Sequence, residues 1–166
     1  ACGDDDGPPP DDSGLQNVEV TRPDRPPLEE YEECTVTTAD DPAESAQHQT
    51  PCSDIEYPET PPSSGMHYSA WADFATYTGP VPYGFLVHAQ EHGGIVLHYR
   101  CEEDCDEILA LFEDLIEEHG EDPLCATHPT SRSRFIVVPD PELDVAIAAT
   151  AWEHVYKATC LDPESL

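Results

Sequence analysis

Apolar side chains recur with two different spacings in the second half of the chain, and these spacings predict its regular elements. Over residues 103–119 the apolar side chains fall at helical intervals among acidic ones, which predicts a helix that Gly120 ends. Its apolar stripe consists of Ile108, Leu111, Phe112 and Leu115. The continuous apolar runs at residues 95–99 and 134–138 are short enough to be buried strands.

The remaining segments give weaker signals. Residues 143–152 suit a third strand, although their alanines also suit a helix, and residues 154–160 form a short amphipathic piece. Residues 85–92 have the length of one or two helical turns before a Gly-Gly pair, and residues 34–62 are expected to be loop. These elements predict a small single α+β domain with a short mixed or antiparallel sheet, one main helix and long disulfide-stapled loops.

The N-terminal segment differs from the rest in composition. Residues 1–27 are rich in Asp, Pro and Gly and are expected to form an acidic flexible tether, followed by the histidine-containing domain at 28–166. Within this segment, residues 15–20 alternate enough to become a strand if a sheet edge is available.

Charge narrows the range of partners. The 166 residues include 36 Asp and Glu but only 6 Lys and Arg, and the formal net charge is -30. A surface of this kind repels phosphate backbones and anionic lipids, which excludes a nucleic-acid-binding role. No apolar run approaches the roughly 20 residues that a membrane-spanning helix requires.

Seven cysteines in a chain of this length predict an oxidising, extracytoplasmic location: the periplasm, the outer membrane surface or the extracellular space. Six of them are candidates for disulfides: Cys34, Cys52, Cys101, Cys105, Cys125 and Cys160. Six cysteines allow fifteen pairings. The pair Cys34–Cys52 is favoured because both residues lie in one loop-rich segment, and Cys160 is then expected to reach back to Cys101, Cys105 or Cys125.

Cys2 stands apart from the other cysteines. It opens a run of Asp, Gly and Pro that resembles the start of a bacterial lipoprotein, in which this cysteine carries lipid and anchors the protein to the outer membrane. Ala1 precedes it, whereas a processed lipoprotein begins at its cysteine, so a further thiol is the alternative.

Four of the eight histidines fall between Pro61 and Tyr99. His88 and His92 are spaced by four residues, which places both rings on one side of a helical turn, and His67 follows a Ser-Ser-Gly turn. Imidazole is a common ligand of zinc and copper, and the thioether of Met66 favours copper. The sequence therefore predicts a site for a transition metal, with copper preferred to zinc.

The segments YPETPPSSGMHY, VPYGFLVHAQEHGGIVLHY and AATAWEH together resemble the bacterial domain of unknown function 3105 family. The resemblance runs from about His48 to about Cys160. It implies an exported or membrane-anchored protein, and it adds His48, which lies where the family carries an upstream histidine. The shared polar positions are His48, His67, His88, Glu91 and His92.

These observations lead to one main functional hypothesis: an exported protein that binds copper or zinc through His48, His67, His88 and His92, with Met66. Metal handling, electron transfer or metal-dependent oxidation would be its role. Side chains expected to fix the ring tautomers from outside the ligand set are Glu91, Tyr68 and Tyr99.

Two alternatives remain open at this stage. A structural subunit that self-assembles into a filament or larger complex through its N-terminal segment is one of them. The other starts from the pattern H-x-x-E-H at residues 88–92, the signature of inverzincin zinc peptidases. Such a peptidase needs a longer helix and a third ligand on a following helix, whereas a Gly-Gly pair and a predicted strand follow here.

Overall fold

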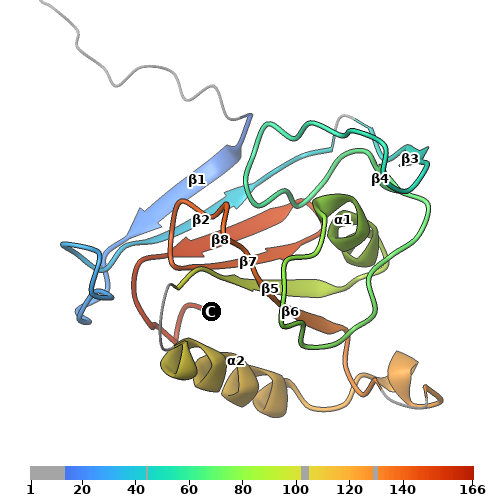
Figure 1. The fold of residues 1–166 in the computed structure, drawn as a ribbon. Helices are drawn as coiled ribbons and strands as arrows, with labels where there is room; N and C mark the ends of the chain where they lie inside the picture. Colours follow the sequence, from blue (N-terminus) through green and yellow to red (C-terminus); the bar gives the residue numbers. More distant parts are fainter. Residues whose placement is uncertain (1–13, 44, 102–104, 129–130) are drawn as a thin grey trace, which may run out of the picture.

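A mixed sheet of six strands carries one α-helix on each face (Figure 1). The computed structural model describes residues 14–43, 45–101, 105–128 and 131–166. The strand order is β1-β2-β8-β7-β5-β6, in which only β5 and β6 are parallel neighbours. The predicted α+β class with a mixed sheet is confirmed.

The elements have these bounds. The sheet contains β1 (Gln16–Thr21), β2 (Val36–Asp40), β5 (Ile95–Tyr99), β6 (Phe135–Pro139), β7 (Ile147–Ala151) and β8 (His154–Ala158). A separate parallel pair is formed by β3 (His48–Gln49) and β4 (His67–Tyr68). The helices are α1 (Tyr83–Glu91), α2 (Asp106–His119) and the 3-10 turn η1 (Pro123–Cys125).

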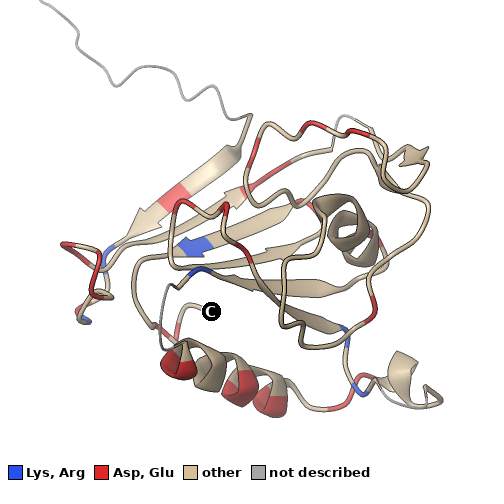
Figure 2. Ribbon diagram, viewed as in Figure 1, with Lys and Arg blue, Asp and Glu red and all other residues tan. Residues whose placement is uncertain are grey.

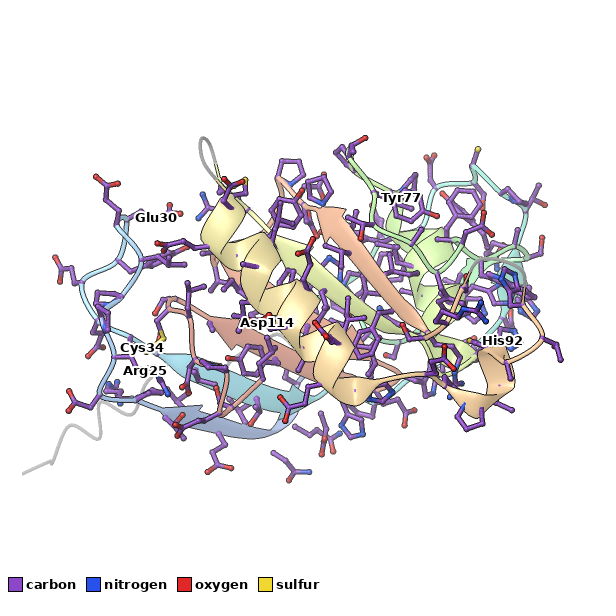
Figure 3. All side chains as sticks on the ribbon, turned by 90° about the horizontal axis from the view of Figure 1, so that it is seen from below. Arg25, Glu30, Cys34, Tyr77, His92 and Asp114 are labelled. Atoms are coloured by element: carbon purple, nitrogen blue, oxygen red, sulfur yellow. A yellow bond between two sulfur atoms is a disulfide. The ribbon has the colours of Figure 1, made fainter. Side chains whose placement is uncertain are left out.

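Alternation along the central strands creates two cores. In β5, Leu97 packs on the α2 face, whereas Val96 packs with α1 residues on the opposite face. Successive side chains of a strand point to opposite faces, so an apolar run buried on both sides needs a cover on each. Helix α2 supplies one cover through Ile108 and Phe112, and α1 supplies the other through Leu86 and Ala89 (Figures 1 and 3).

Helix α2 has the predicted amphipathic stripe. Ile108 and Phe112 are buried, Leu111 and Leu115 are partly buried against the same core, and Gly120 ends the helix. Acidic residues lie along its outer side (Figure 2). The predicted start at residue 103 falls outside the described residues, and the helix as described begins at Asp106.

The prediction for residues 34–62 is wrong in part, because this segment contains β2 and β3. Strand β2 is inserted between β1 and β8, and its partner β8 lies more than a hundred residues away in sequence. Its short Thr-rich pattern is too weak to identify a strand without that partner. Residues 147–151 form strand β7 rather than a helix, because small side chains such as Ala148 fit a central strand buried on both faces.

Strand β1 lies within the segment expected to be a tether. It pairs antiparallel with β2 at the edge of the sheet, and all of its residues are exposed. The sheet therefore begins at Gln16, inside residues 1–27, where the alternation of residues 15–20 predicts a strand that needs a sheet edge. Cys2 lies outside the described residues.

The disulfide pairing differs from the prediction. Cys34 pairs with Cys160 rather than with Cys52, and Cys101 pairs with Cys105. The register of β2 on β8 sets Val36 opposite Ala158, so the residues two positions beyond each strand end, Cys34 and Cys160, also face each other. Cys52 is exposed and free, and Cys125 is buried and free.

Candidate metal centre

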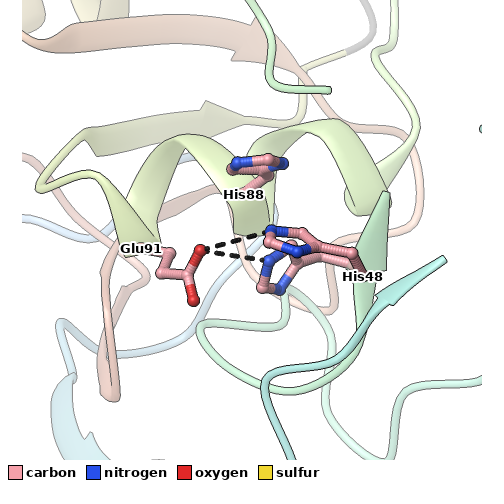
Figure 4. Close-up of side chains that lie close together, drawn as sticks. His48, His88 and Glu91 are labelled. Carbon is pink, nitrogen blue, oxygen red and sulfur yellow. Dashed lines mark ion pairs between the residues drawn. The ribbon is translucent and has the colours of Figure 1, made fainter. Parts of the chain in front are cut away.

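Three histidines and one glutamate converge beside α1. His48 comes from β3, His67 from β4, and His88 and Glu91 from α1. The parallel pairing of β3 with β4 sets His48 directly opposite His67. One ligand atom from each of the four side chains lies within 4.8 Å of all the others (Figure 4). Their rings and carboxylate thus face a common point.

His67 is fully buried and its tautomer is fixed by a carbonyl group. Its Nδ1 lies 2.9 Å from the backbone oxygen of Gly65, which only accepts, so Nδ1 carries the hydrogen. In the neutral ring, the other nitrogen, Nε2, keeps its lone pair. Nε2 has no hydrogen-bond partner among the described residues, and it lies 3.3 Å from Oε2 of Glu91. In this neutral form, two acceptors face each other with no hydrogen between them.

His88 repeats this arrangement from the opposite side. Its Nδ1 donates to the backbone oxygen of Tyr68 at 2.5 Å, which again leaves Nε2 with a lone pair. Burial lowers the pKa of His88, partly opposed by the hydrogen bond to Tyr68 and reinforced by the neighbouring histidines. A neutral ring with a free Nε2 is the form in which histidine binds metals.

His48 and Glu91 complete the group on its more open side. The His48 side chain is 51% exposed, and its Nε2 lies 3.7 Å from Oε2 of Glu91. The His48 ring centre is 4.8 Å from those of both His67 and His88. Converging lone pairs and a carboxylate repel one another unless a cation lies among them. The group is therefore able to hold a metal ion.

His92, predicted as a ligand, lies at the edge of this group. It follows the last residue of α1 and is exposed. Its Nε2 is 3.0 Å from Nε2 of His88, and the two rings are stacked with centres 4.9 Å apart. His92 is not among the four residues whose ligand atoms converge.

Met66 and the two predicted tyrosines make other contacts. The Met66 side chain is exposed, and its sulfur accepts a hydrogen bond from Gln49. Tyr68 contributes its backbone oxygen to His88, whereas its hydroxyl donates to Ser53. Tyr99 packs against the core on the α2 face of the sheet.

Two tryptophans that the sequence reasoning did not select border the rings. Trp152 contacts His67 edge to face, with ring centres 5.9 Å apart. Trp71 is 52% exposed and contacts both His88 and His92, at 5.3 and 4.9 Å between ring centres. Both lie in or next to the histidine-containing segments, which was the only signal available in the sequence.

A directional chain of buried hydrogen bonds ties α1 to the sheet. Gln90 donates to Thr150 at 2.7 Å, Thr150 contacts Nε2 of His98 at 3.1 Å, and Nδ1 of His98 lies 2.9 Å from Asp140. Because a carboxylate only accepts, Nδ1 of His98 is the donor, and its Nε2 accepts from the Thr150 hydroxyl. Tyr83, at the other end of α1, donates to Asp140. His98 is therefore structural, and the chain sets the position of the helix that carries His88 and Glu91.

A second buried contact positions the loop that precedes His67. The Asp41 carboxylate accepts from both the backbone and the hydroxyl of Ser63, and the Ser63 carbonyl accepts from the backbone of Glu153. Gln90 also donates to the carbonyl of Pro62. These bonds place the Gly65 carbonyl that fixes the His67 tautomer.

The arrangement of residues 88–92 differs from that of an inverzincin motif. Glu91 belongs to the converging group and His92 does not, whereas the peptidase motif uses both of its histidines as ligands. The other two ligands come from β3 and β4, which precede α1, and a strand follows it. This placement does not support the peptidase alternative.

The fold and the cluster define a small α+β domain with a candidate metal centre of three histidines and a glutamate. A comparison with protein-family models matches residues 48–166 to the family described as protein of unknown function (DUF3105), and the chain belongs to this family. Searches of curated proteins and of solved structures each gave no match. In the part of the chain that the structure describes, no helix has the length and apolar character needed to cross a membrane.

Proposed function

We propose that this protein binds one divalent transition-metal ion through His48, His67, His88 and Glu91, and that it does so outside the cytoplasm. The observation that carries the proposal is the pair of fixed tautomers. His67 and His88 each donate through Nδ1 to a backbone carbonyl, which leaves the lone pair of Nε2 as the ligand site of each ring in the converging group. Metal-ligating histidines are typically oriented by such a bond from the second nitrogen.

The buried, unpaired Nε2 of His67 strengthens this interpretation. Burying an acceptor without a partner is unfavourable by about 1 to 3 kcal/mol, so such groups are rare unless a ligand satisfies them. A carboxylate oxygen of Glu91 lies 3.3 Å away, and in its ionised form it supplies no hydrogen. A cation gives Nε2 of His67 a partner and also attracts the carboxylate of Glu91.

The donor set favours copper(II) over zinc. The affinity of a site made of imidazole nitrogens and one carboxylate follows the usual order, in which copper(II) binds most tightly among first-row divalent ions. The thioether of Met66 accepts a hydrogen bond from Gln49, so it adds no argument for a soft site that prefers copper(I). Metal handling, electron transfer or a metal-dependent oxidation at the cell surface are the roles that such a site serves.

Metal binding is tested by calorimetric titration of protein treated with a chelator. We expect one copper(II) per chain, bound more tightly than zinc(II), and a loss of affinity greater than about tenfold in His67→Ala and His88→Ala. His154→Ala is the matched control, because His154 is an exposed histidine that contacts Asp40 and is not among the converging residues. Wild-type protein that binds neither ion, or variants that bind as the wild type does, would contradict the proposal.

Export is supported by the disulfides Cys34–Cys160 and Cys101–Cys105, which persist in oxidising compartments. Anchoring to the outer membrane through a lipidated Cys2 belongs to the same proposal. Mass spectrometry of the N-terminal peptide from cells tests it. An unmodified Cys2 in protein recovered from the soluble fraction would argue against the anchor while leaving the metal site untouched.

A second candidate function, assembly into a larger complex, is favoured by β1. This edge strand is exposed over its whole length, and Val18 and Val20 are about half exposed. An uncovered edge strand is a ready template for pairing with another chain. Light scattering over a range of concentrations tests this function, and a monomer at every concentration would exclude it.

A further inference from the structure

The short contact between His92 and His88 identifies which nitrogen carries a hydrogen. Nε2 of His88 has only a lone pair, because Nδ1 of the same ring donates to Tyr68. The 3.0 Å contact between the two Nε2 atoms is therefore a hydrogen bond only if Nε2 of His92 is the donor. The N–H donor of His92 thus lies at the edge of the four converging ligand atoms.

His92 is held in this position from its backbone. Its N–H donates to the carbonyl of His88, and its own carbonyl accepts from Nη1 of Arg134 at 2.8 Å. Arg134 is fixed in turn by its 2.6 Å contact with Asp122, and this bond lowers the pKa of that carboxyl group. The ring of His92 lies against Trp71 on an exposed part of the surface. The donor is therefore both positioned and open to solvent.

A metal ion that takes the lone pair of His88 removes the acceptor that the described residues offer to this N–H. The donor then lies beside a bound cation on its more exposed side. A positive centre next to an N–H group is complementary to an anion. Copper(II) in tetragonal sites commonly accepts further ligands beyond those that the protein supplies.

We propose, on the basis of the metal site above, that His92 is not a metal ligand but the hydrogen-bond donor for a small exogenous anion bound to the metal on its solvent-exposed side. Trp71 contacts both His88 and His92 and therefore lies beside this position. The site then has four protein ligands and one exchangeable anion. This arrangement serves chemistry at the metal as well as storage of the ion.

Azide is the probe for this site. Copper(II)-loaded wild-type protein is titrated with sodium azide, and binding is followed by the azide-to-copper charge-transfer absorption and by electron paramagnetic resonance. We expect saturable binding of one azide per copper. His92→Phe keeps an aromatic ring but lacks the donor, and should weaken azide binding by roughly tenfold, the effect of one hydrogen bond to a charged group.

Two further variants test whether the effect of His92→Phe comes from the lost N–H donor rather than from a change in the fold or the loss of a metal ligand. His92→Gln retains an N–H donor and should recover most of the azide affinity. His154→Phe replaces an exposed histidine outside the cluster and should bind azide as the wild type does. Copper affinity is measured for every variant without azide, and retention within about threefold in His92→Phe distinguishes a donor from a ligand.

Several results would overturn the inference. Copper-loaded wild-type protein that gives no azide response would do so while leaving the proposed metal site intact. Equal azide affinity in the wild type and His92→Phe would show that His92 is not the donor. A loss of copper affinity above tenfold in both His92→Phe and His92→Gln would make His92 a ligand. Failure of the wild type to bind copper at all removes the proposed function first, and is seen before any azide is added.

Discussion

Oε2 of Glu91 lies 3.3 Å from Nε2 of His67, although neither atom carries a hydrogen when the carboxylate is ionised and the ring donates through Nδ1 to Gly65. The histidine ring is fully buried, whereas the glutamate side chain is about one-third exposed. With the ring neutral, this contact opposes stability in the metal-free protein, and it becomes favourable once a cation lies between the two atoms.

Glu91→Gln should therefore change stability and metal affinity in opposite directions. The amide supplies a hydrogen to Nε2 of His67, so we expect the free energy of unfolding of the metal-free protein to rise by about 1 kcal/mol. Copper affinity should fall by more than about tenfold, because a charged ligand is lost. Urea unfolding and calorimetry measure the two quantities. Glu117→Gln, on the exposed face of α2, is the control, and a decrease in both quantities for Glu91→Gln would refute this explanation.

Thr150→Val should show how strongly the buried chain of hydrogen bonds holds α1 on the sheet. Valine matches threonine in shape but leaves both the Gln90 amide and Nε2 of His98 without the partner they have now. We expect a loss of about 2 to 4 kcal/mol in the free energy of unfolding. Thr38→Val, at an exposed position of β2, should stay within about 0.5 kcal/mol. Equal effects in the two variants would mean that the chain contributes nothing.

The buried pair of His98 and Asp140 predicts a pH dependence of stability. Burial lowers the pKa of His98 below its ordinary 6.5, and the hydrogen bond to Asp140 opposes this only in part. The unfolded chain therefore binds a proton here at a higher pH than the folded protein does. The contribution of His98 to the free energy of unfolding is thus fully present above pH 6.5. It is lost as the pH falls from 6.5 towards the lowered pKa.

Asp140 adds a second loss of stability, at lower pH. Burial raises the pKa of its carboxyl group, but the hydrogen bonds from His98 and Tyr83 outweigh this effect and lower the pKa below the ordinary 3.8. Its contribution is present above 3.8 and is lost as the pH falls through the folded value. Experiments above about pH 5 therefore isolate the histidine.

His98→Asn removes the titrating ring and keeps a donor for Asp140. Below pH 6.5, the stability of the wild type relative to this variant should fall by up to about 1.4 kcal/mol for each pH unit. Above about pH 7 the difference should be constant. Urea unfolding at several pH values measures it, with His119→Asn as the exposed control. A constant difference across the whole range would exclude the linkage.

The two disulfides should contribute unequally. Cys34–Cys160 closes a loop with a sequence separation of 126 residues, whereas Cys101–Cys105 spans only 4. In the chain-entropy model the long loop is worth about 4 to 5 kcal/mol and a loop of a few residues much less. The double variant Cys34→Ala/Cys160→Ala should therefore lose far more stability than Cys101→Ala/Cys105→Ala.

Thiol counting in denatured, unreduced protein checks the same pairing. Among the described cysteines, only Cys52 and Cys125 should react, and reductant should release the other four. Reaction of Cys34 or Cys160 before reduction would contradict the pairing. Peptide mapping separates these sites from Cys2.

Local patterns were sufficient to predict several elements. The apolar runs at β5 and β6, the stripe Ile108 to Leu115 in α2, and the short helix before Gly93 were each readable from neighbouring residues, because burial on a helix or strand repeats over a few positions. The same holds for the histidines. Their number and spacing indicated a metal site before any fold was known, and the resemblance placed His48 with them.

The sequence by itself thus determined the class of fold, the acidic surface and the histidines of the candidate metal centre. Only the tertiary structure decided that Glu91 converges with them, that His92 is not among the converging residues, and that Cys34 pairs with Cys160. Each of these results depends on contacts between segments far apart in the chain, such as β2 on β8 and β3 beside β4. Periodicity reports which face of an element is buried, but it carries no information about the partner or the register that the element meets, and ligand geometry depends on both.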